Sequence, residues 1–449
     1  MFNREKLIEE GREESSLSKL MNTYISPLLI CLFLAAILIL NFVPSSYYLA
    51  KAAYVKATVA PNGPTVNDPN LKVEKVFSGE LNVPTSMAFL GPNDILVLEK
   101  NKGIVDRIVN GKLMPQPVLQ ISNIANEEVE WGLLGIAIDR RGNDALGPTY
   151  VFLYYTEKGS SGERPANHLY RYQLSSDGAK LENPTLLLNL PANSPDPQGE
   201  SNHDGGKIVI GPDHNVYAAI GDVGGHRGQA QNTRDGARLD GTSGILRVAE
   251  NGKLVSPNPL GGDDPTRVYY AYGIRNSFGF DFDPVTGNLW DTENGADDND
   301  EINLVAAGFN SGWLKVQGMA PSGFDPARVL VTFDEKGKYH DPQFVWRQTI
   351  GPTALKFLNS DKLGKQYDNT FFTGDVNTGN LYNFKLNADR TNLLLNGALS
   401  DRIADTRDEL QPVIFGQGFG VITDIKVGPG DGYLYMLTYD GSIYRILPN

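Results

Sequence analysis

The stretch NHDGGKIVIGPDHNVYAAIGDVGG, residues 202–225, decides the fold, because its central phrase returns through the rest of the chain. The phrase joins a tight turn of Gly, Pro, Asp and Asn to a short apolar strand. Similar phrases begin at residues 91, 139, 211, 283, 364 and 428. This recurrence predicts a repeated β unit.

A second strand follows most copies of the phrase. These strands are expected at residues 103–108, 168–174, 244–250, 379–386 and 441–447. Repeated strand–turn–strand units predict blades arranged around a central channel. We therefore expect an all-β fold, a six-bladed β-propeller over residues 71–449. Two β-sandwiches are the alternative, but sandwiches do not require one phrase to return through a continuous segment.

The composition agrees with this fold and limits the partners. The chain has 449 residues with 48 Gly, 27 Pro and 20 Tyr, which suits many short strands joined by tight turns. Its formal net charge is −13, whereas nucleic-acid-binding proteins need a clustered basic surface. Nucleic acid is therefore not an expected partner.

The N-terminal part predicts a membrane anchor. Residues 25–43 carry no charged side chain, and this length is close to the ~20 residues that cross a bilayer. Residues 1–24 form a polar leader, and residues 44–70 form a linker without periodicity. A cleaved signal peptide is the alternative, but it would begin with a short basic leader. The single cysteine, Cys31, lies in the apolar segment, so neither an intrachain disulfide nor a thiol-based metal site is expected.

His203 and Asp222 form the first candidate site. His203 lies at the entry to a strand, and Asp222 lies nineteen residues later, where the following strand ends. If these strands pair as a hairpin, Asp222 accepts a hydrogen bond from the imidazole, and the pair provides a general base near neutral pH. The alternative is a solvated His203 beside an Asp222 that caps the glycine turn. His214 is expected in an exposed turn. The remaining histidines have no evident partner in the sequence: His168, His226 and His340.

Two further clusters suit an anionic ligand and a cation. Arg275 and Asn276 offer a fixed cation and an amide to a carbonyl or carboxylate, unless Arg275 only makes a surface ion pair. The loop TENGADDNDEINL, residues 292–304, is rich in carboxylates around a Gly turn, which is chemistry that Ca²⁺ prefers. It lacks the EF-hand spacing, and a solvated acidic loop is the alternative.

Three segments together resemble the soluble quinoprotein sugar dehydrogenases, which are the glucose, sorbosone and aldose dehydrogenases that depend on pyrroloquinoline quinone (PQQ). These segments are residues 202–225, EWGLLGIAID at 130–139, and residues 272–313. The resemblance extends over essentially all of residues 71–449 and keeps the motif order. It implies a six-bladed propeller that binds PQQ and Ca²⁺ and oxidises a sugar.

The resemblance also implies roles for individual residues. His203 matches the base that removes the proton of the anomeric hydroxyl while hydride moves to the quinone. Asp222 matches the carboxylate that orients this histidine. Arg275 matches the cation beside the reactive quinone carbonyl, where it stabilises the reduced oxygen. Asn276 and Glu130 match residues that contact the cofactor or substrate.

The acidic loop matches the calcium site of the family. Gly295 and Ala296 align with the two backbone carbonyls that hold the ion, which polarises the quinone as a Lewis acid. Asp300 and Glu301 follow in the acidic part of the loop, where further calcium ligands are expected.

The sequence departs from the family where PQQ's carboxylates bind. In the glucose enzymes a Lys and two Arg hold these groups, whereas Asn377, Val421 and Thr423 stand at the corresponding positions here. Asn377 and Thr423 are therefore the expected cofactor contacts. Each lost charge-assisted contact costs about 1.5–3 kcal/mol, so weaker PQQ binding is expected.

The sequence thus favours a membrane-anchored, PQQ- and calcium-dependent sugar dehydrogenase. PQQ enzymes act outside the cytoplasmic membrane, so a single-pass protein with an extracytoplasmic propeller is expected, with an electron acceptor that the sequence does not identify. The alternative is a non-catalytic calcium-binding propeller that binds a glycan or protein partner. A calcium-dependent lactonase is a third hypothesis.

Overall fold

The computed structural model describes residues 60–140, 147–160, 162–193, 201–235, 238–261 and 266–449. The predicted leader and membrane anchor, residues 1–24 and 25–43, lie outside this part of the chain. Among the described residues, no helix is long and apolar enough to cross a membrane.

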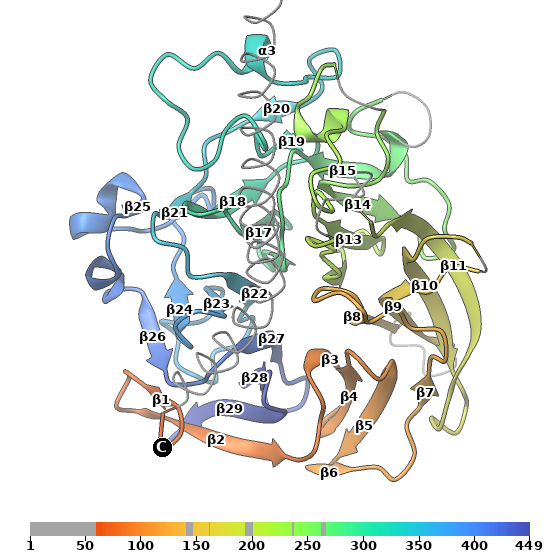
Figure 1. The fold of residues 1–449 in the computed structure, drawn as a ribbon. Helices are drawn as coiled ribbons and strands as arrows, with labels where there is room; N and C mark the ends of the chain where they lie inside the picture. Colours follow the sequence, from red (N-terminus) through yellow and green to blue (C-terminus); the bar gives the residue numbers. More distant parts are fainter. Residues whose placement is uncertain (1–59, 141–146, 161, 194–200, 236–237, 262–265) are drawn as a thin grey trace, which may run out of the picture. The chain divides into compact units, whose positions relative to one another are not determined.

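These residues form six β-sheets, of which three begin with strands from the first half of the fold (Figure 1). The first contains β3 (Pro84–Gly91), β4 (Asp94–Glu99), β5 (Ile104–Val109) and β6 (Lys112–Leu113), and β7 (Leu119–Gln120) also pairs with β5. The second contains β8 (Leu133–Arg140), β9 (Thr149–Glu157), β10 (Ala166–Leu174) and β11 (Leu181–Pro191). The third contains β12 (Ile208–Ile210), β13 (Val216–Ile220), β14 (Gly244–Val248), β15 (Tyr269–Tyr272), β19 (Phe309–Asn310) and β20 (Lys338–Tyr339).

The other three sheets come from the second half, with two strands added from the N-terminal side. The fourth contains β16 (Gly279–Phe282), β17 (Leu289–Glu293), β18 (Asp300–Val305), β21 (Phe344–Trp346) and β25 (Ile403–Ala404). The fifth contains β22 (Pro352–Phe357), β23 (Phe371–Asp375), β24 (Leu381–Phe384), β26 (Ile414–Gln417) and β1 (Thr65–Val66). The sixth contains β27 (Ile422–Val427), β28 (Leu434–Thr438), β29 (Ser442–Pro448) and β2 (Leu71–Ser78).

Helical structure in the described residues is limited to short turns. The α-helix α3 spans Pro326–Val329. The 3-10 turns span Gln229–Gln231, Thr266–Val268, Gly397–Asp401 and Arg407–Leu410.

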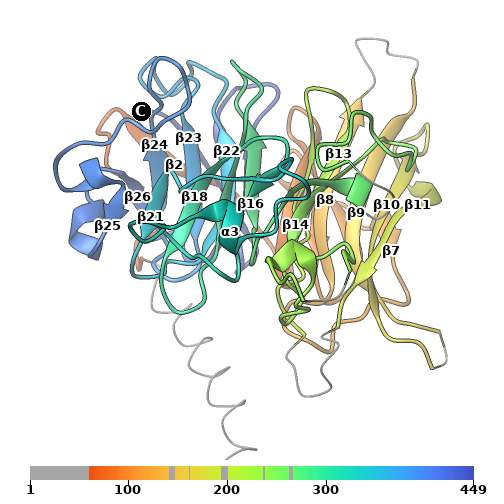
Figure 2. The ribbon, with the colours of Figure 1, turned by 90° about the horizontal axis from the view of Figure 1, so that it is seen from above.

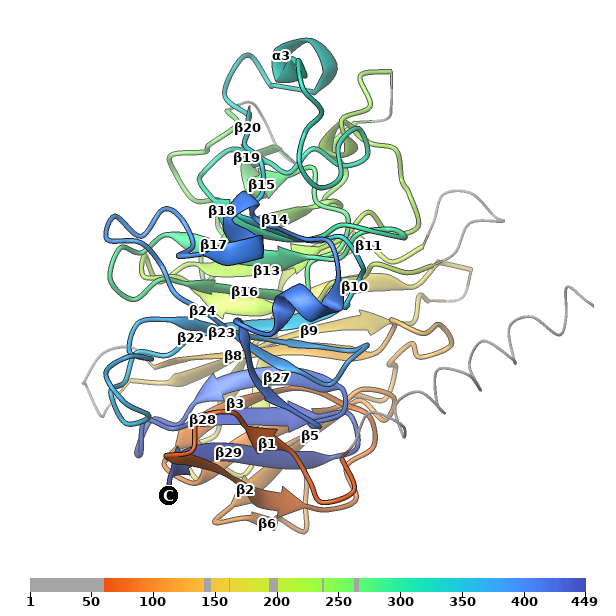
Figure 3. The same cartoon turned by 90° about the vertical axis from the view of Figure 1, so that its left-hand side faces the viewer.

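The two ends of the β fold are joined by strand pairing. β2 lies antiparallel to β29, and the backbone N–H of Asn449 donates to the carbonyl of Asn70 at 2.9 Å. The C-terminus therefore lies beside β1 and β2 in Figures 1 and 3. β1 pairs with β26, so the sheet structure begins before residue 71, within the segment expected to be linker.

The hydrophobic core lies between neighbouring sheets. Six clusters of buried side chains connect the first sheet to the second, the second to the third, and so on until the sixth meets the first again. Strands such as β13 (VYAAI) and β28 (LYMLT) are buried at every position, because a sheet covers each of their faces. Figure 2 shows the second and third sheets on the opposite side from the fifth.

This closed succession of sheets is the arrangement of a propeller, so the predicted all-β propeller fold is confirmed. One central cavity is lined by residues from one strand of each sheet: β3, β8, β12, β16, β22 and β27. We call these six strands the inner strands. The loops that precede them converge, which brings residues that are distant in the sequence to one place.

Candidate functional site

The predicted site residues lie in the loops that precede three inner strands. His203 precedes β12, Arg275 precedes β16 and Glu130 precedes β8. His203 has a positive φ of 62°, a conformation uncommon for residues other than glycine and often found at functional sites.

His203 and Asp222 are paired as the spacing predicted. The antiparallel pairing of β12 with β13 brings the start of one strand to the end of the other, and His203 Nδ1 lies 2.5 Å from Asp222 Oδ1. The second oxygen of Asp222 accepts a hydrogen bond of 2.9 Å from the indole Nε1 of Trp313. Asp222 is buried, with 3 % of its surface exposed, so both hydrogen bonds fix its carboxylate in the site.

Gly221 packs the histidine against the segment that carries Arg275. A Cβ atom at this position would lie 2.4 Å from the carbonyl oxygen of Arg275 and 2.5 Å from that of His203. The backbone N–H of Asp222 donates to the same carbonyl of Arg275 at 2.9 Å. The glycine therefore allows the catalytic candidates to approach closely.

Arg275 holds the loop that the sequence predicted to bind calcium. Its Nη1 donates to the carbonyl oxygens of Asn294 at 2.9 Å and Gly295 at 2.8 Å, and its guanidinium lies 5.5 Å from the Trp313 ring centre. Trp313 thus contacts both Asp222 and Arg275. This tryptophan therefore links the His203–Asp222 pair to the guanidinium of Arg275.

The carboxylate of Asp300 holds the same loop through hydrogen bonds with the backbone. Its Oδ1 accepts a hydrogen bond from the backbone N–H of Gly295, and its Oδ2 accepts from those of Ile350 and Gly351. Its carboxylate is thus engaged by backbone groups. The backbone N–H of Ala296 donates to the side chain of Gln317 at 3.3 Å.

Two buried glutamates lie opposite each other beneath this loop. Glu293 accepts hydrogen bonds from the backbone N–H of Arg275 at 2.7 Å and the hydroxyl of Ser311 at 2.6 Å. Burial raises the pKa of Glu293 to about 7. Its cross-strand partner Glu301 is buried as well, and burial together with the charge of Glu293 raises the pKa of Glu301 well above its ordinary value.

A second cluster of charged side chains lies around Asp204, the residue after His203. Asp204 is fully buried, its backbone N–H donates to Glu130 Oε2 at 3.1 Å, and its Oδ1 accepts from Asn167 at 2.6 Å. Burial raises the pKa of Asp204 well above its ordinary value, and Glu130 adds to this rise. Burial also lowers the pKa of the nearby Lys100 to about 8, although Glu130 and Asp204 oppose the change.

The predicted cofactor contacts lie in loops, except Thr423, which lies at the start of an inner strand. Asn276 is 3 % exposed, and its side-chain oxygen has no hydrogen-bond partner among the described residues. The backbone N–H of Asn377 donates to the carbonyl of Ile350, whose own N–H is held by Asp300. Thr423 lies in β27, where its hydroxyl donates to the carbonyl of Leu437 at 3.3 Å, and Val421 directly precedes that strand.

The structure adds partners that the sequence did not reveal. His168 Nδ1 lies 2.6 Å from Glu157, and His226 Nδ1 lies 2.7 Å from Asp240, so the expectation that these histidines lack partners was wrong. The His226 Nε2 atom also lies 2.6 Å from the carbonyl oxygen of Asn193, so both ring nitrogens are engaged within the protein. Neither histidine competes with His203 for the role of base.

Three residues of the site were missed: Lys100, Asp204 and Trp313. Asp204 directly follows His203, and this adjacency was an available signal. Lys100 and Trp313 come from distant loops, and only the ring of sheets brings them here.

The metal prediction depends on backbone oxygens. Within the described ranges, no group of three or more His, Cys, Asp and Glu side chains is placed to hold a metal ion. The loop nevertheless turns tightly, because a Cβ on Gly295 would lie 1.9 Å from the carbonyl oxygen of Asp298 and 2.7 Å from that of Asn299. Several carbonyl oxygens therefore gather at this turn.

Comparison with known proteins assigns this arrangement to a family. Residues 81–445 match the family model described as Glucose / Sorbosone dehydrogenase. The quinoprotein glucose dehydrogenase B of Acinetobacter calcoaceticus is 30% identical over 453 residues, covering 84% of this chain and 89% of the relative. The aldose sugar dehydrogenase YliI of Escherichia coli K12 is 26% identical over 382 residues, covering 83% of this chain and 92% of the relative.

A solved structure supports the fold. The apo form of the soluble aldose sugar dehydrogenase of Escherichia coli superimposes with a TM-score of 0.65 at 23% identity. The match covers 84% of this chain and 100% of that chain.

Proposed function

The chain belongs to the glucose/sorbosone dehydrogenase family of oxidoreductases, and from this we propose that it oxidises an aldose-type sugar to its lactone with PQQ as cofactor. The observation that carries the proposal is the 2.5 Å contact between His203 Nδ1 and Asp222 Oδ1. It supplies the oriented base that oxidation of a hydroxyl group needs.

In the proposed mechanism, His203 acts as a base through Nε2, the ring nitrogen that does not contact Asp222. Because Nδ1–H donates a hydrogen bond to Asp222, the Nε2 atom of the neutral ring carries the lone pair. Nε2 accepts the proton of the anomeric hydroxyl, and the charge of Asp222 stabilises the resulting imidazolium. Trp313 keeps the carboxylate in this orientation through its second oxygen.

The residues present suit PQQ at its quinone end. The side-chain oxygen of Asn276, which has no hydrogen-bond partner in the described part of the chain, lies in the segment of Arg275, so an acceptor and a cation are available there. PQQ, when bound, would supply the acceptor for the hydride of the sugar. At the carboxylate end, Asn377 and Thr423 offer an amide and a hydroxyl in place of cations, which supports weak rather than absent binding.

We extend the proposal to calcium. The carbonyl oxygens of Gly295 and Ala296 would bind the ion, and the tight turn up to Asn299 supplies further oxygens. Asp300 contributes by holding Gly295 in place through its backbone N–H. Arg275 fixes the Gly295 carbonyl from the other side. The ion would supply Lewis acidity at the quinone.

We also propose that residues 25–43 anchor the protein in the membrane and that the propeller lies on the extracytoplasmic side. The uncharged run of these residues supports the anchor. The electron acceptor would then be a partner reached from that side.

The test is reduction of an artificial electron acceptor by the purified full chain with PQQ, Ca²⁺ and a panel of aldoses. Activity that depends on all three, and that is lost in His203→Ala, is expected. A protein that binds Ca²⁺ but not PQQ would instead support the non-catalytic alternative, and hydrolysis of a lactone without PQQ would support the lactonase.

A further inference from the structure

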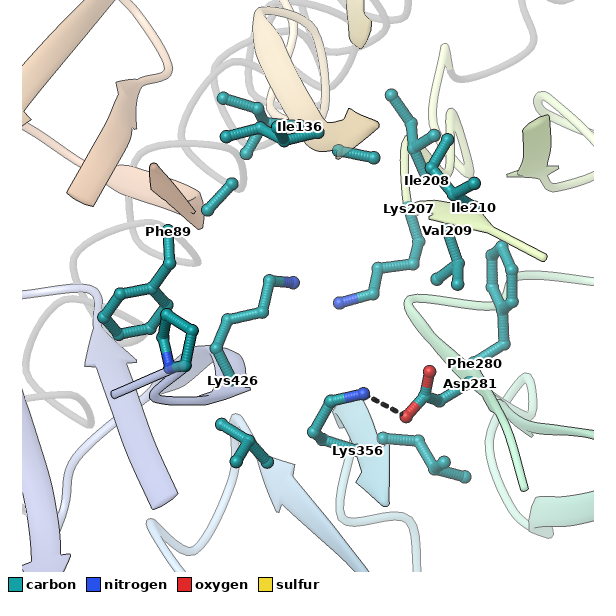
Figure 4. A pocket seen from close by; sticks show the side chains of 16 residues that line it. Phe89, Ile136, Lys207, Ile208, Val209, Ile210, Phe280, Asp281, Lys356 and Lys426 are labelled. Atoms are coloured by element: carbon teal, nitrogen blue, oxygen red, sulfur yellow. Dashed lines mark hydrogen bonds and ion pairs between the residues drawn. The ribbon is translucent and has the colours of Figure 1, made fainter. Parts of the chain in front are cut away.

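The inner strands surround a cavity of about 440 Å³ (Figure 4), and neither His203 nor Arg275 is among the described residues that line it. Its lining comes mainly from residues within the inner strands, for example Ile136 of β8, Asp281 of β16 and Lys356 of β22, and also from Lys207 just before β12. His203 and Arg275 precede their strands. The cavity therefore lies further along the channel, away from the site end.

Three lysines from different inner strands or their ends converge in this cavity. Lys207 directly precedes β12, Lys356 belongs to β22 and Lys426 to β27. Figure 4 shows their ammonium groups pointing into the open space. The side chain of Lys207 is only 8% exposed, and those of Lys426 and Lys356 are 18% and 26% exposed, so these are not ordinary surface lysines.

The cations outnumber their carboxylate partners. Lys207 and Lys426 share Asp424, with distances of 2.8 and 2.9 Å, and Lys356 lies 2.6 Å from Asp281. Asp281 is the one acidic side chain among the described residues that line the cavity. Within the described ranges, three ammonium groups thus face two carboxylates, which leaves one positive charge without a counterion.

The hydrogen-bond donors are also in excess. Asp424 Oδ2 already accepts from the hydroxyl of Ser86 at 2.7 Å and the backbone N–H of Met87 at 3.0 Å, and Asp281 Oδ2 accepts from the N–H of Phe357 at 2.9 Å. Asp424 is therefore largely used by other groups, and one oxygen of Asp281 is shared between Lys356 and the backbone. Each ammonium has three donors, so most of the lysine donors remain available to a ligand.

Crowding of like charge supports the same conclusion. Burial lowers the pKa of Lys426 to about 8, and the neighbouring Lys207 and Lys356 lower it further, while Asp424 opposes the change. Neutralising two buried carboxylates requires only two lysines. A third buried cation costs free energy unless an anion accompanies it.

We propose that the channel cavity binds a small multivalent oxyanion of the phosphate class, held by Lys207, Lys356 and Lys426. Ammonium groups bind phosphate as point charges, and a ligand with several oxygens accepts from all three at once. The volume leaves room for more than one phosphate group, so inorganic phosphate and pyrophosphate are both suitable probes. The proposal does not depend on PQQ or on dehydrogenase activity.

Calorimetric titration of the full chain with inorganic phosphate in calcium-free buffer tests the proposal. We expect one site per chain with a submillimolar Kd, and a higher Tm in phosphate than in chloride of equal ionic strength. Tighter binding of pyrophosphate would identify the larger ligand as the better fit. A wild-type protein without heat of binding or a shift in Tm at 10 mM phosphate, roughly ten or more times the expected Kd, would overturn the proposal.

Variants locate the site. Lys356→Gln should weaken phosphate binding about tenfold or more, because one of three charges is lost. Lys356→Arg keeps the charge and should bind within about threefold of the wild type. Lys385→Gln, at an exposed position just after β24, is the matched control and should bind as the wild type does. Equal binding by Lys356→Gln and the control would contradict the assignment.

Discussion

Asp222 lies 2.5 Å from His203 through one carboxylate oxygen. Its other oxygen accepts a hydrogen bond from Trp313 at 2.9 Å, so the carboxylate that orients the histidine is itself oriented from another loop. Under the proposed function, the base therefore depends on three residues that span 111 positions of the chain, from 203 to 313.

Asp222→Asn should lower kcat by about 10²–10⁴-fold, the usual contribution of an oriented general base. The amide keeps the shape of the side chain but does not stabilise the imidazolium. Steady-state kinetics with saturating PQQ and Ca²⁺ measures the effect, and KM for the sugar should change little. A variant with unchanged kcat would show that the pair has only a structural role.

Trp313→Phe should lower kcat less, by about tenfold. Phenylalanine keeps an aromatic ring under Arg275 but lacks the indole donor, so one charge-assisted hydrogen bond worth about 1.5–3 kcal/mol is lost while the His203 contact remains. The same kinetic assay gives the ratio to Asp222→Asn. An equal or larger loss than in Asp222→Asn would mean that the tryptophan acts mainly through something other than Asp222.

Asn377→Lys should strengthen PQQ binding by about 10–100-fold, because it adds one charge-assisted contact of about 1.5–3 kcal/mol. Fluorescence titration with PQQ measures the Kd of the variant and the wild type. Asn392→Lys, which adds the same charge at an exposed position, is the control for nonspecific attraction. If both variants gain equally, Asn377 does not face the cofactor.

Asp375 should make stability depend on pH. Burial raises the pKa of this carboxyl from 3.8 to about 6, although hydrogen bonds from Thr378, Gly379 and Tyr382 oppose the rise. The folded state therefore binds the proton more tightly than the unfolded chain, and stability falls as pH rises between these two values. In Asp375→Asn this dependence is absent.

Denaturant unfolding at pH 4 and pH 7 checks this point. The free energy of unfolding of the wild type minus that of Asp375→Asn should fall by about 2–3 kcal/mol over the interval, since one pKa unit corresponds to about 1.4 kcal/mol. The difference between pH values removes any fixed cost of the substitution. A difference that stays constant would show that folding does not raise the pKa of Asp375.

The fold was predictable because its signal is local and repeated. Each turn and strand phrase reports one hairpin, and the six sheets follow from stacking these units. The pairing of β2 with β29 was not predicted, because nothing within residues 71–78 marks the C-terminal strand as their partner. The pairing of β1 with β26 was likewise not predicted, because β1 lies within the segment expected to be linker.

The site was predictable where its residues share a hairpin. His203 lies before the start of β12 and Asp222 after the end of β13, at the same end of one hairpin, so their spacing in the sequence was enough to predict the contact. Trp313 and Lys100 reach the site from other parts of the ring, and no spacing in the sequence reports that contact. The acidic loop was recognised by its composition. The sequence did not show that Asp300 accepts hydrogen bonds from three backbone N–H groups of the protein.

The most direct test of the proposed function is aldose-dependent reduction of a dye by the full chain, with PQQ and Ca²⁺ supplied together and then omitted one at a time. The account predicts turnover only with both present, and loss of turnover in His203→Ala while PQQ binding is retained. Turnover that persists in His203→Ala, or a wild-type protein that binds PQQ and Ca²⁺ yet oxidises no aldose, would contradict it.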